Sequence, residues 1–311
     1  MSFRQDVEGS HRTTFANTVV QVMNQNPGRI RAMTQVVNCE GDSRNVADLL
    51  DDKEPSEAED YSMTNPNNRS KLDPVWLLRP KVIESGEYIY KEDKWDMAMD
   101  PTSNFTASHV RAVRKGEFDR ILGIRKVQGE NRWVVNGNGI MGRRITGKGK
   151  TGAALPAGNT IPHDGEGMTL TRLNTLVLNF GLEDIGLEED MTNQICAVLS
   201  PFQRRDLLQI AIQTETQLNA YQVDQIKNAR PTSLFGIDWM FSNRVPKEGT
   251  VRKCPFWRKA GIVTGIWEEF YGDLWNDTSA KRRPYTYVGG ALDATRIEDK
   301  DVQIMECEEG V

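Results

Sequence analysis

The glycines of residues 137–152 form the pattern in this sequence that could most readily do chemistry. Gly137, Gly139 and Gly142 have the G-x-G-x-x-G spacing of a dinucleotide-binding turn, and a short strand is expected over residues 132–135, just before them. Such a turn binds pyrophosphate only when a helix begins at the third glycine. Further glycines follow here instead, so the sequence predicts no helix and argues against a dinucleotide site.

The same segment also approaches the phosphate-binding P-loop. Gly142 and Gly147–Lys148 have the right spacing, but Gly149 occupies the position where Ser or Thr must hold Mg²⁺. We therefore favour a long, flexible surface loop whose cations are solvated or face an acidic neighbour or phosphates. These cations are Arg143, Arg144, Lys148 and Lys150. A nucleotide-dependent enzyme that uses Gly137–Gly152 is the weakest of the functions considered.

The other residue types that carry chemistry lack the necessary spacing. The four cysteines lie far apart without a C-x-x-C pair, which predicts buried, reduced thiols rather than a zinc or iron–sulfur site. The histidines are expected to be structural, and the acidic clusters lack the alternation of a Ca²⁺ loop. The sequence thus predicts no catalytic residue, metal or cofactor, unless the fold assembles a catalytic set from distant residues. The residues concerned are Cys39, Cys196, Cys254, Cys307, His11, His109 and His163, with the acidic clusters 51–60 and 188–190.

Composition excludes several broad classes. The chain has 311 residues, of which 27% are charged and 38% hydrophobic, and its net charge is -5. The negative net charge gives no general reason for nucleic-acid binding, so any DNA contact must be local. No apolar run approaches the ~18 residues of a membrane span, and no signal-peptide pattern follows Met1. We expect a protein that is neither secreted nor integral to a membrane.

A long helix is the first element that could position these loops. Asp100–Pro101 supplies an N-cap and a first-turn proline, and an imperfect apolar stripe continues over residues 102–125. Gly116 in its middle predicts close approach by another backbone, because glycine costs helix stability. Gly123 is a candidate terminator of this helix.

The remaining patterns mix helix and strand and predict an α+β fold. Ser200–Pro201 is expected to cap a helix that directly follows a short apolar strand. The expected elements are helices over residues 170–181 and 202–212, and strands over residues 195–199, 233–245, 255–266, 285–292 and 302–307, the last two forming a β pair.

The first hundred residues contain only short apolar islands and an acidic stretch over residues 48–60. Two strands, over residues 75–82 and 88–95, are expected to form a β-hairpin that turns at residues 84–87. Short islands rarely repay the entropy of ordering, and an isolated hairpin is marginal in water. We therefore interpret this region as an arm and a loop that dock on other subunits. The contact candidates are Trp76, Leu78, Tyr88, Tyr90 and Trp95.

The order of these elements resembles the major capsid protein of tailed double-stranded-DNA bacteriophages, which has the Hong Kong 97-type fold. The resemblance covers residues 70–309 and rests on diffuse features rather than on one short signature. The matching segments are Met99–Ser103, Val110–Lys115, Phe118–Leu122, Gly167–Leu170, Val198–Pro201, Asp206–Leu208, Leu234–Ile237, Ser242–Pro246, Gly290–Glu298 and Val302–Cys307.

The resemblance implies a division of the chain into five segments. An arm and an extended β-hairpin loop would reach neighbouring subunits, and a peripheral domain with a long spine helix would flank an axial α/β domain. The implied segments are the arm 1–60, the extended loop 61–98, the peripheral domain 99–168 with its spine helix 100–126, the axial domain 169–280 and the second peripheral part 281–311.

The resemblance also implies a non-enzymatic, structural function. Copies would assemble in the host cytoplasm, as pentamers and hexamers, into the icosahedral head shell of a virion around weakly contacted double-stranded DNA. The segment before the hairpin is too short for a fused scaffold, so a separate scaffolding protein is expected, with a portal and a candidate decoration or cement protein. The basic loop residues are expected to form ion pairs between subunits in preference to DNA contacts. An encapsulin-like nanocompartment shell is the alternative.

Overall fold

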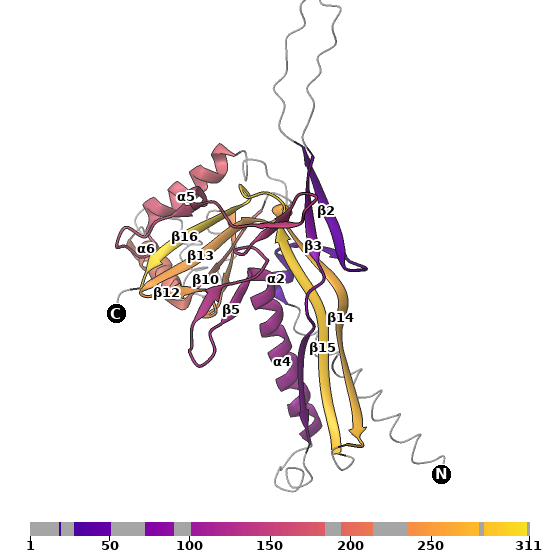
Figure 1. Cartoon of the computed structure of the whole chain (residues 1–311). Helices are drawn as coiled ribbons and strands as arrows, with labels where there is room; N and C mark the ends of the chain where they lie inside the picture. Colours follow the sequence, from indigo (N-terminus) through magenta and orange to yellow (C-terminus); the bar gives the residue numbers. More distant parts are fainter. Residues whose placement is uncertain are drawn as a thin grey trace, which may run out of the picture.

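The computed structural model describes residues 19, 28–50, 72–89, 101–183, 194–213, 236–279 and 283–309, and the statements below concern this part of the chain. Figure 1 shows two regions side by side. A rounded α/β region carries helices α5 (Leu170–Leu182) and α6 (Pro201–Gln213), and next to it helix α4 (Pro101–Leu122) lies along an elongated β-sheet. The predicted α+β class is confirmed.

The rounded region is built on one mixed sheet. Strand β10 is parallel to β11 and antiparallel to β13, and every residue of β10 is buried, as a continuous apolar run predicts for a strand covered on both faces. The predicted N-cap of α6 is confirmed, since the Phe202 N–H donates to Ser200 Oγ at 3.2 Å. The strand order is β11 (Ile237–Phe241), β10 (Ile195–Leu199), β13 (Val251–Arg258), β16 (Val302–Glu308) and β9 (Thr160–Ile161), with β12 (Lys247–Glu248) beside β13.

The elongated region consists of α4 and a second sheet, in the order β1 (Gln35–Asn38), β14 (Ile262–Asp277), β15 (Arg283–Arg296) and β4 (Ile83–Tyr88). In Figure 1, β14 and β15 run beside α4 and extend past the rounded region. The close approach predicted at Gly116 is present, because an added Cβ would lie 2.6 Å from Ile83 Cγ2. The approaching group is therefore a side chain of β4 rather than another backbone.

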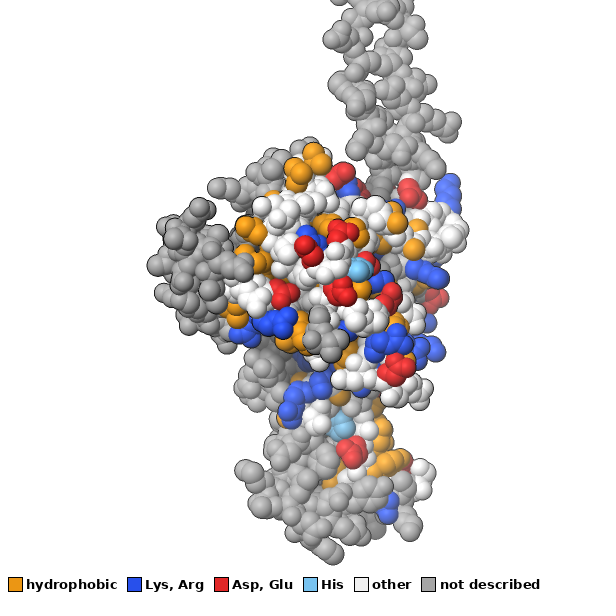
Figure 2. All heavy atoms as spheres, turned by 90° about the vertical axis from the view of Figure 1, so that its left-hand side faces the viewer, with side chains coloured by type: hydrophobic (Ala, Val, Ile, Leu, Met, Phe, Trp, Pro, Cys, Tyr) orange, Lys and Arg blue, Asp and Glu red, His pale blue; other side chains and the backbone are white. Residues whose placement is uncertain are grey.

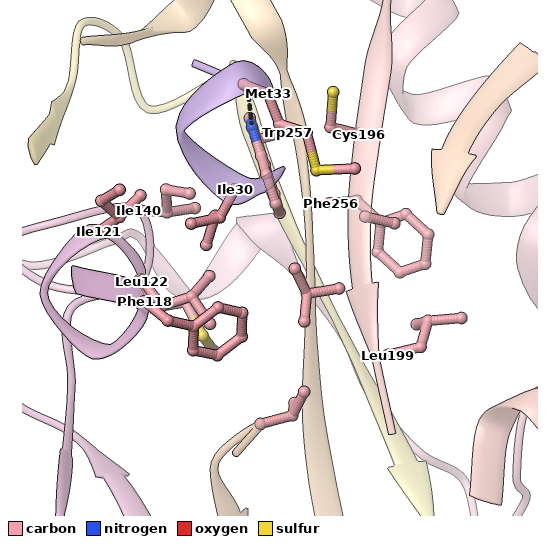
Figure 3. Close-up of a cluster of buried hydrophobic side chains, with 14 of the residues drawn as sticks. Ile30, Met33, Phe118, Ile121, Leu122, Ile140, Cys196, Leu199, Phe256 and Trp257 are labelled. Atoms are coloured by element: carbon pink, nitrogen blue, oxygen red, sulfur yellow. Dashed lines mark hydrogen bonds between the residues drawn. The ribbon is translucent and has the colours of Figure 1, made fainter. Parts of the chain in front are cut away.

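One hydrophobic core joins the two regions, as Figure 3 shows. Phe118 and Leu122 of α4 lie on one side of it, and Phe256 of β13 lies on the other. The indole N–H of Trp257 donates to the Met33 carbonyl at 2.9 Å, next to the short helix α2 (Arg29–Ala32). Burying each large apolar side chain contributes ~1.5–3 kcal/mol, so we expect the two regions to unfold together.

The loop that contains the glycine motif packs against the C-terminal end of α4 and does not form a phosphate site. Gly123 has φ 74° and ends the helix as predicted, but the chain continues directly into β5 (Ile124–Lys126), so the predicted extension of the helix to residue 126 is wrong. Backbone N–H groups of Ile140 and Met141 donate to the Ile121 and Leu122 carbonyls, both at 3.0 Å. The loop thus satisfies carbonyls that a helix end leaves unpaired.

The close packing of this loop contradicts both the dinucleotide interpretation and the expectation of a surface loop throughout. Cβ atoms on Gly139 and Gly142 would lie 2.5 Å from Gly123 N and 2.4 Å from Gly137 O, which leaves no space for a phosphate. Ile140 is buried next to them. The predicted strand before the motif is present as β6 (Trp133–Val135), paired with β5.

A buried carboxyl connects this loop to β15. Asn138 Nδ2 donates to Asp293 Oδ2 at 3.0 Å, and Asp293 Oδ1 has no hydrogen-bond partner within the described residues. Burial raises the pKa of Asp293 to about 6, although Asn138 and Arg120 oppose the change. The fold therefore favours the protonated form of this side chain.

This raised pKa predicts a pH-dependent effect of Asp293→Asn. Wild-type stability should fall as pH rises from 4 to above 6, because the buried carboxyl must ionise, at a cost of about 3 kcal/mol. The neutral amide avoids this cost, so the variant should be more stable than wild type at pH 8 and lose that advantage near pH 4. Urea unfolding at both pH values measures the difference, and an equal difference at both would contradict the expectation.

The predicted β-hairpin is wrong. Strand β3 (Leu72–Leu78) pairs antiparallel with β2 (Ser43–Leu50), whereas β4 pairs with β15 and contains the residues 84–87 that were expected to turn. The sequence pattern located the first strand approximately, but it placed a turn where β4 lies and could not specify which strands pair. The hairpin that does form is the β2–β3 ribbon, and its connection, residues 51–71, lies outside the described residues.

Three further strand predictions need correction. The single strand expected over residues 255–266 is two strands, β13 and β14, separated by a 3₁₀ turn at Lys259–Gly261. The expected final β pair does not form, because β15 belongs to the elongated sheet and β16 to the rounded one. The described part of the strand expected over residues 233–245 is β11, which is shorter.

The thiol and histidine expectations fit the described residues. All four cysteines are free and buried. His109 lies between Ser85 Oγ, at 2.9 Å from Nδ1, and Thr286 Oγ1, at 3.2 Å from Nε2, and burial lowers its pKa. His163 Nδ1 accepts a hydrogen bond from the Gly165 N–H in a loop, while His11 lies outside the described residues. Both described histidines thus have structural contacts.

Candidate subunit-contact surfaces

The β2–β3 ribbon carries two of the predicted contact residues. Trp76 is half-buried, its indole N–H donates to the Gly147 carbonyl at 3.0 Å, and Lys150 Nζ lies 4.7 Å from its ring centroid. Leu78, also half-buried, is opposite Ser43 at the base of the ribbon. These contacts hold the ribbon against the adjacent strands β7 (Arg144–Thr146) and β8 (Thr151–Ala153).

The basic loop residues divide into two pairs. Arg144 donates to the Ile297 carbonyl at 2.7 Å, and Lys150 Nζ donates to Ser43 Oγ at 2.7 Å, so both have partners in their own chain. Arg143 and Lys148 are exposed and form no ion pair with any described residue. These two side chains are the better candidates for contacts with other molecules.

Charges of both signs are mixed on the face shown in Figure 2. Lysine and arginine side chains lie next to aspartate and glutamate side chains, and the described residues on this face form no broad region of one sign. A DNA backbone requires many cations on one surface for tight binding. This face therefore offers at most weak electrostatic attraction to a DNA backbone.

Tyr88 belongs to a larger group that we call the aromatic ladder. Its centroid lies 4.7 Å from that of Tyr285, Trp275 lies 5.0 Å from Tyr285, and Tyr271 lies 5.9 Å from Tyr287. The ladder consists of Tyr88, Tyr271, Trp275, Tyr285 and Tyr287 on strands β4, β14 and β15. The other predicted contact residues, Tyr90 and Trp95, lie outside the described residues.

The sequence prediction missed four members of the ladder. Tyr271 and Trp275 lie four residues apart, and Tyr285 and Tyr287 lie two apart, so each pair has the period-two spacing of one strand face. The alternation of aromatic residues along each strand was therefore the available signal. This signal does not show that the two strands pair with each other. In the fold, Trp275 and Tyr285 are directly opposite each other.

Carboxylates border the ladder. The Tyr287 hydroxyl donates to Glu84 Oε2 at 3.1 Å, and the Tyr88 hydroxyl donates to Asp277 Oδ2 at 2.7 Å. Burial and the hydrogen bond to Glu84 raise the pKa of Tyr287, so this phenol stays a neutral donor. Aromatic faces bordered by carboxylates attract cations.

The described residues provide no metal centre. They contain no group of three or more His, Cys, Asp or Glu side chains that could hold a metal ion. None of their helices is long and apolar enough to cross a membrane.

Comparison with known proteins identifies the family. The family model described as phage capsid protein matches residues 7–309, while no curated protein matches the chain. The capsid of cyanophage P-SCSP1u is similar at a TM-score of 0.62 and 11% identity, covering 89% of this chain and 87% of that one. The capsid of the native GTA particle is similar at a TM-score of 0.59 and 13% identity, covering 91% of this chain and 90% of that one. The holo-SrpI encapsulin complex of Synechococcus elongatus PCC 7942 is similar at a TM-score of 0.51 and 10% identity, covering 90% of this chain and 87% of that one.

These matches support one another at different levels. The solved structures are distant in sequence and establish the fold, whereas the family model spans nearly the whole chain and establishes the family. The resemblance identified from the order of the elements is therefore confirmed. The chain belongs to the phage capsid protein family and is a shell-forming structural protein with the Hong Kong 97-type fold.

Proposed function

We propose that this protein is the major subunit of an icosahedral phage head, assembled as pentamers and hexamers around packaged double-stranded DNA. The observation that carries the proposal is the family match over residues 7–309. The encapsulin-like alternative shares the fold, as the SrpI similarity indicates, but the family match favours the phage shell. We further infer a non-enzymatic role, assembly in the host cytoplasm, and a separate scaffolding protein, a portal and a decoration or cement protein as partners.

The strand pairings support a revised division of the subunit. We assign the extended loop to the β2–β3 ribbon, residues 43–78, and the arm to the residues before it. Strands β4, β14 and β15 form one sheet beside α4, so we assign them to the peripheral domain. Strand β16 pairs with β13, so we assign it to the axial domain. This division differs from the segments that the resemblance implied.

Negative-stain microscopy tests the proposed function. The full chain, expressed alone and with the genes that neighbour its own, should yield shells, rings or aberrant polymers. Neighbouring portal and terminase genes would support the phage head, whereas a neighbouring cargo enzyme would support the nanocompartment. A stable monomer or dimer under every condition would exclude both shells.

Replacement of residues 51–71 by a short Gly-Ser turn should abolish closed shells while leaving the subunit folded. Strands β2 and β3 would keep their pairing, and the buried Val75 and Leu77 would keep their contacts. The physical reason is that a ribbon reaching a neighbour contributes area only in the assembly. Sedimentation measures the shells, and circular dichroism measures the fold.

The matched control for this replacement is a scrambled 51–71 segment of the same length and composition. If the scrambled segment also abolishes shells, the contact depends on the sequence of residues 51–71. If shells form, the length and charge of this segment are sufficient for the contact. Normal shells from the shortened chain would show that this ribbon is not the loop that joins subunits.

A further inference from the structure

The aromatic ladder lies on the outer face of the elongated sheet. Tyr88, Tyr285 and Trp275 are directly opposite one another across three neighbouring strands, so they share one face. The alternate residues Thr286 and Val288 are fully buried, and Thr286 contacts His109 of α4. Helix α4 therefore covers the other face of the sheet and leaves the ladder outside.

Two tyrosine rings of the ladder are closely packed against the sheet. Cβ atoms added to Gly86 and Gly289 would lie 2.5 Å from the Tyr285 hydroxyl and 2.7 Å from the Tyr287 hydroxyl, so both rings lie over glycines. Tyr271 and Trp275 nevertheless remain 39% exposed. Fixed, exposed aromatic rings are typical of binding surfaces, because a partner gains area at little cost in side-chain entropy.

The charge around the ladder selects a cationic partner. Glu84 and Asp277 accept hydrogen bonds from ladder hydroxyls, and Asp273 is opposite Tyr287 on the same face. Among the described residues of this part of the face, the basic side chain is Arg283, opposite Asp277 at the end of the sheet. Carboxylates and aromatic faces together bind lysine and arginine side chains.

An exposed basic turn of the described chain matches this surface. Residues 147–150 connect β7 and β8, and Lys148 in this turn is exposed without an ion pair to any described residue. Arg143, at the start of the same hairpin, is also exposed and unpaired within the described residues. Two cations thus lie on one short, backbone-anchored hairpin.

The turn cannot reach the ladder of its own chain. The Gly147 N–H donates to the Pro74 carbonyl at 2.9 Å, which fixes the turn on β3. Strand β3 meets β14 at Gly265, where an added Cβ would lie 2.8 Å from Leu77. Tyr271 and Trp275 are six and ten residues further along β14, which corresponds to about 20–33 Å. Figure 1 correspondingly shows β2 and β3 at one end of the molecule and the ends of β14 and β15 at the other.

We propose that the aromatic ladder of one subunit binds the basic turn 147–150, with Arg143, of a second copy. The inference rests on the proposed shell function and adds a specific contact to it. Lys148 and Arg143 lie over the exposed rings of Tyr271 and Trp275, and Glu84 supplies the carboxylate. The contact joins the peripheral sheet of one copy to the base of the β2–β3 ribbon of the next.

Photo-crosslinking in assembled particles tests the contact directly. Full-length chains with p-benzoylphenylalanine in place of Trp275 are mixed with ¹⁵N-labelled wild-type chains, assembled and irradiated. Mass spectrometry should find crosslinked peptides that contain residues 143–152 of the other label. The same probe at the exposed Val36 of β1 should not give this product. Crosslinks within one chain, or to a different segment of a second copy, would overturn the proposal.

Charge reversal gives an independent measurement. Lys148→Glu with Arg143→Glu should lower the yield of sedimentable shells about tenfold, and adding Glu84→Lys in the same chain should restore most of it. Arg125→Glu, at an exposed position of β5, is the control and should leave the yield within about twofold. If wild type stays a monomer or dimer under every condition, the proposed function fails; if it forms shells and these reversals leave their yield unchanged, the ladder contact alone fails.

Discussion

Gly123→Ala is expected to prevent the chain from reaching its native fold. Gly123 has φ 74°, a conformation that costs a residue with a side chain about 1–2 kcal/mol. The larger effect is steric, because the new Cβ would lie 2.1 Å from the Asn138 carbonyl oxygen and 3.0 Å from Gly142 N. Both neighbours are backbone atoms, so no side chain can rotate away to relieve the overlap.

Relief of this overlap requires the loop to move off the end of α4. The Ile140 and Met141 N–H groups would then lose their bonds to the Ile121 and Leu122 carbonyls, at about 1 kcal/mol each and more if the groups stay buried. With strain and lost packing of the buried Ile140, the total approaches the 5–15 kcal/mol that typically stabilises a domain. We therefore expect insoluble or unfolded protein.

Gly129→Ala is the matched control. Gly129 has φ 82°, similar to Gly123, but an added Cβ would have no atom within 4 Å. Its expected cost is only the conformational part, about 1–2 kcal/mol. Soluble yield and thermal unfolding compare the two variants. Similar melting temperatures for both would show that the loop can shift without penalty and that it does not stabilise the end of the helix.

The same glycines show why the sequence could mislead about chemistry. Glycine spacing records where the backbone needs positive φ or close approach, and it does not record what approaches. At Gly139 the approaching group is the backbone of Gly123, which is 16 residues away and was itself recognised only as a candidate terminator. Local signals such as Ser200–Pro201 were more informative, because an N-cap and the helix it begins are adjacent in the chain.

The pairing of the strands was the feature of the fold that the sequence predicted least well. Residues 84–87 were expected to turn, but Ile83–Tyr88 is a strand whose partner is β15, about two hundred residues later, as the pair Tyr88–Tyr285 shows. A hairpin between nearby segments is the natural expectation from sequence, since consecutive strands usually pair. The aromatic ladder depends on such a distant pairing. Its members can be recognised as one surface only when the pairing of β4, β14 and β15 is known.

Sequence patterns do not predict buried ion pairs either, and the pair between Arg252 and Glu309 is an example. The side chain of Glu309 is 1% exposed, and the carboxylate accepts hydrogen bonds from Arg252 Nε at 2.8 Å, Lys247 Nζ at 2.8 Å and Ser200 Oγ at 2.9 Å. Burial alone would raise the pKa of Glu309, but these partners outweigh it and lower the value to about 2. The ionised form is therefore strongly favoured in the fold.

Glu309→Gln should destabilise the subunit by about 3–5 kcal/mol at pH 7, because it leaves the buried guanidinium of Arg252 without its counter-charge. The pH dependence identifies the cause. A carboxyl whose pKa falls from 4.5 to about 2 on folding stabilises the native state above pH 4.5 and loses this contribution as pH falls towards 2. The difference between wild type and variant should therefore shrink over that range.

Glu308→Gln provides the control for this prediction. Glu308 is the neighbouring residue and its side chain is 34% exposed, so the loss of its charge should cost at most about 1 kcal/mol. Urea unfolding of all three proteins between pH 2 and pH 7 makes the comparison. A Glu309 effect that is constant with pH would assign the loss to packing, whereas a decline towards low pH assigns it to the charge that ties β16 to β13 and α6.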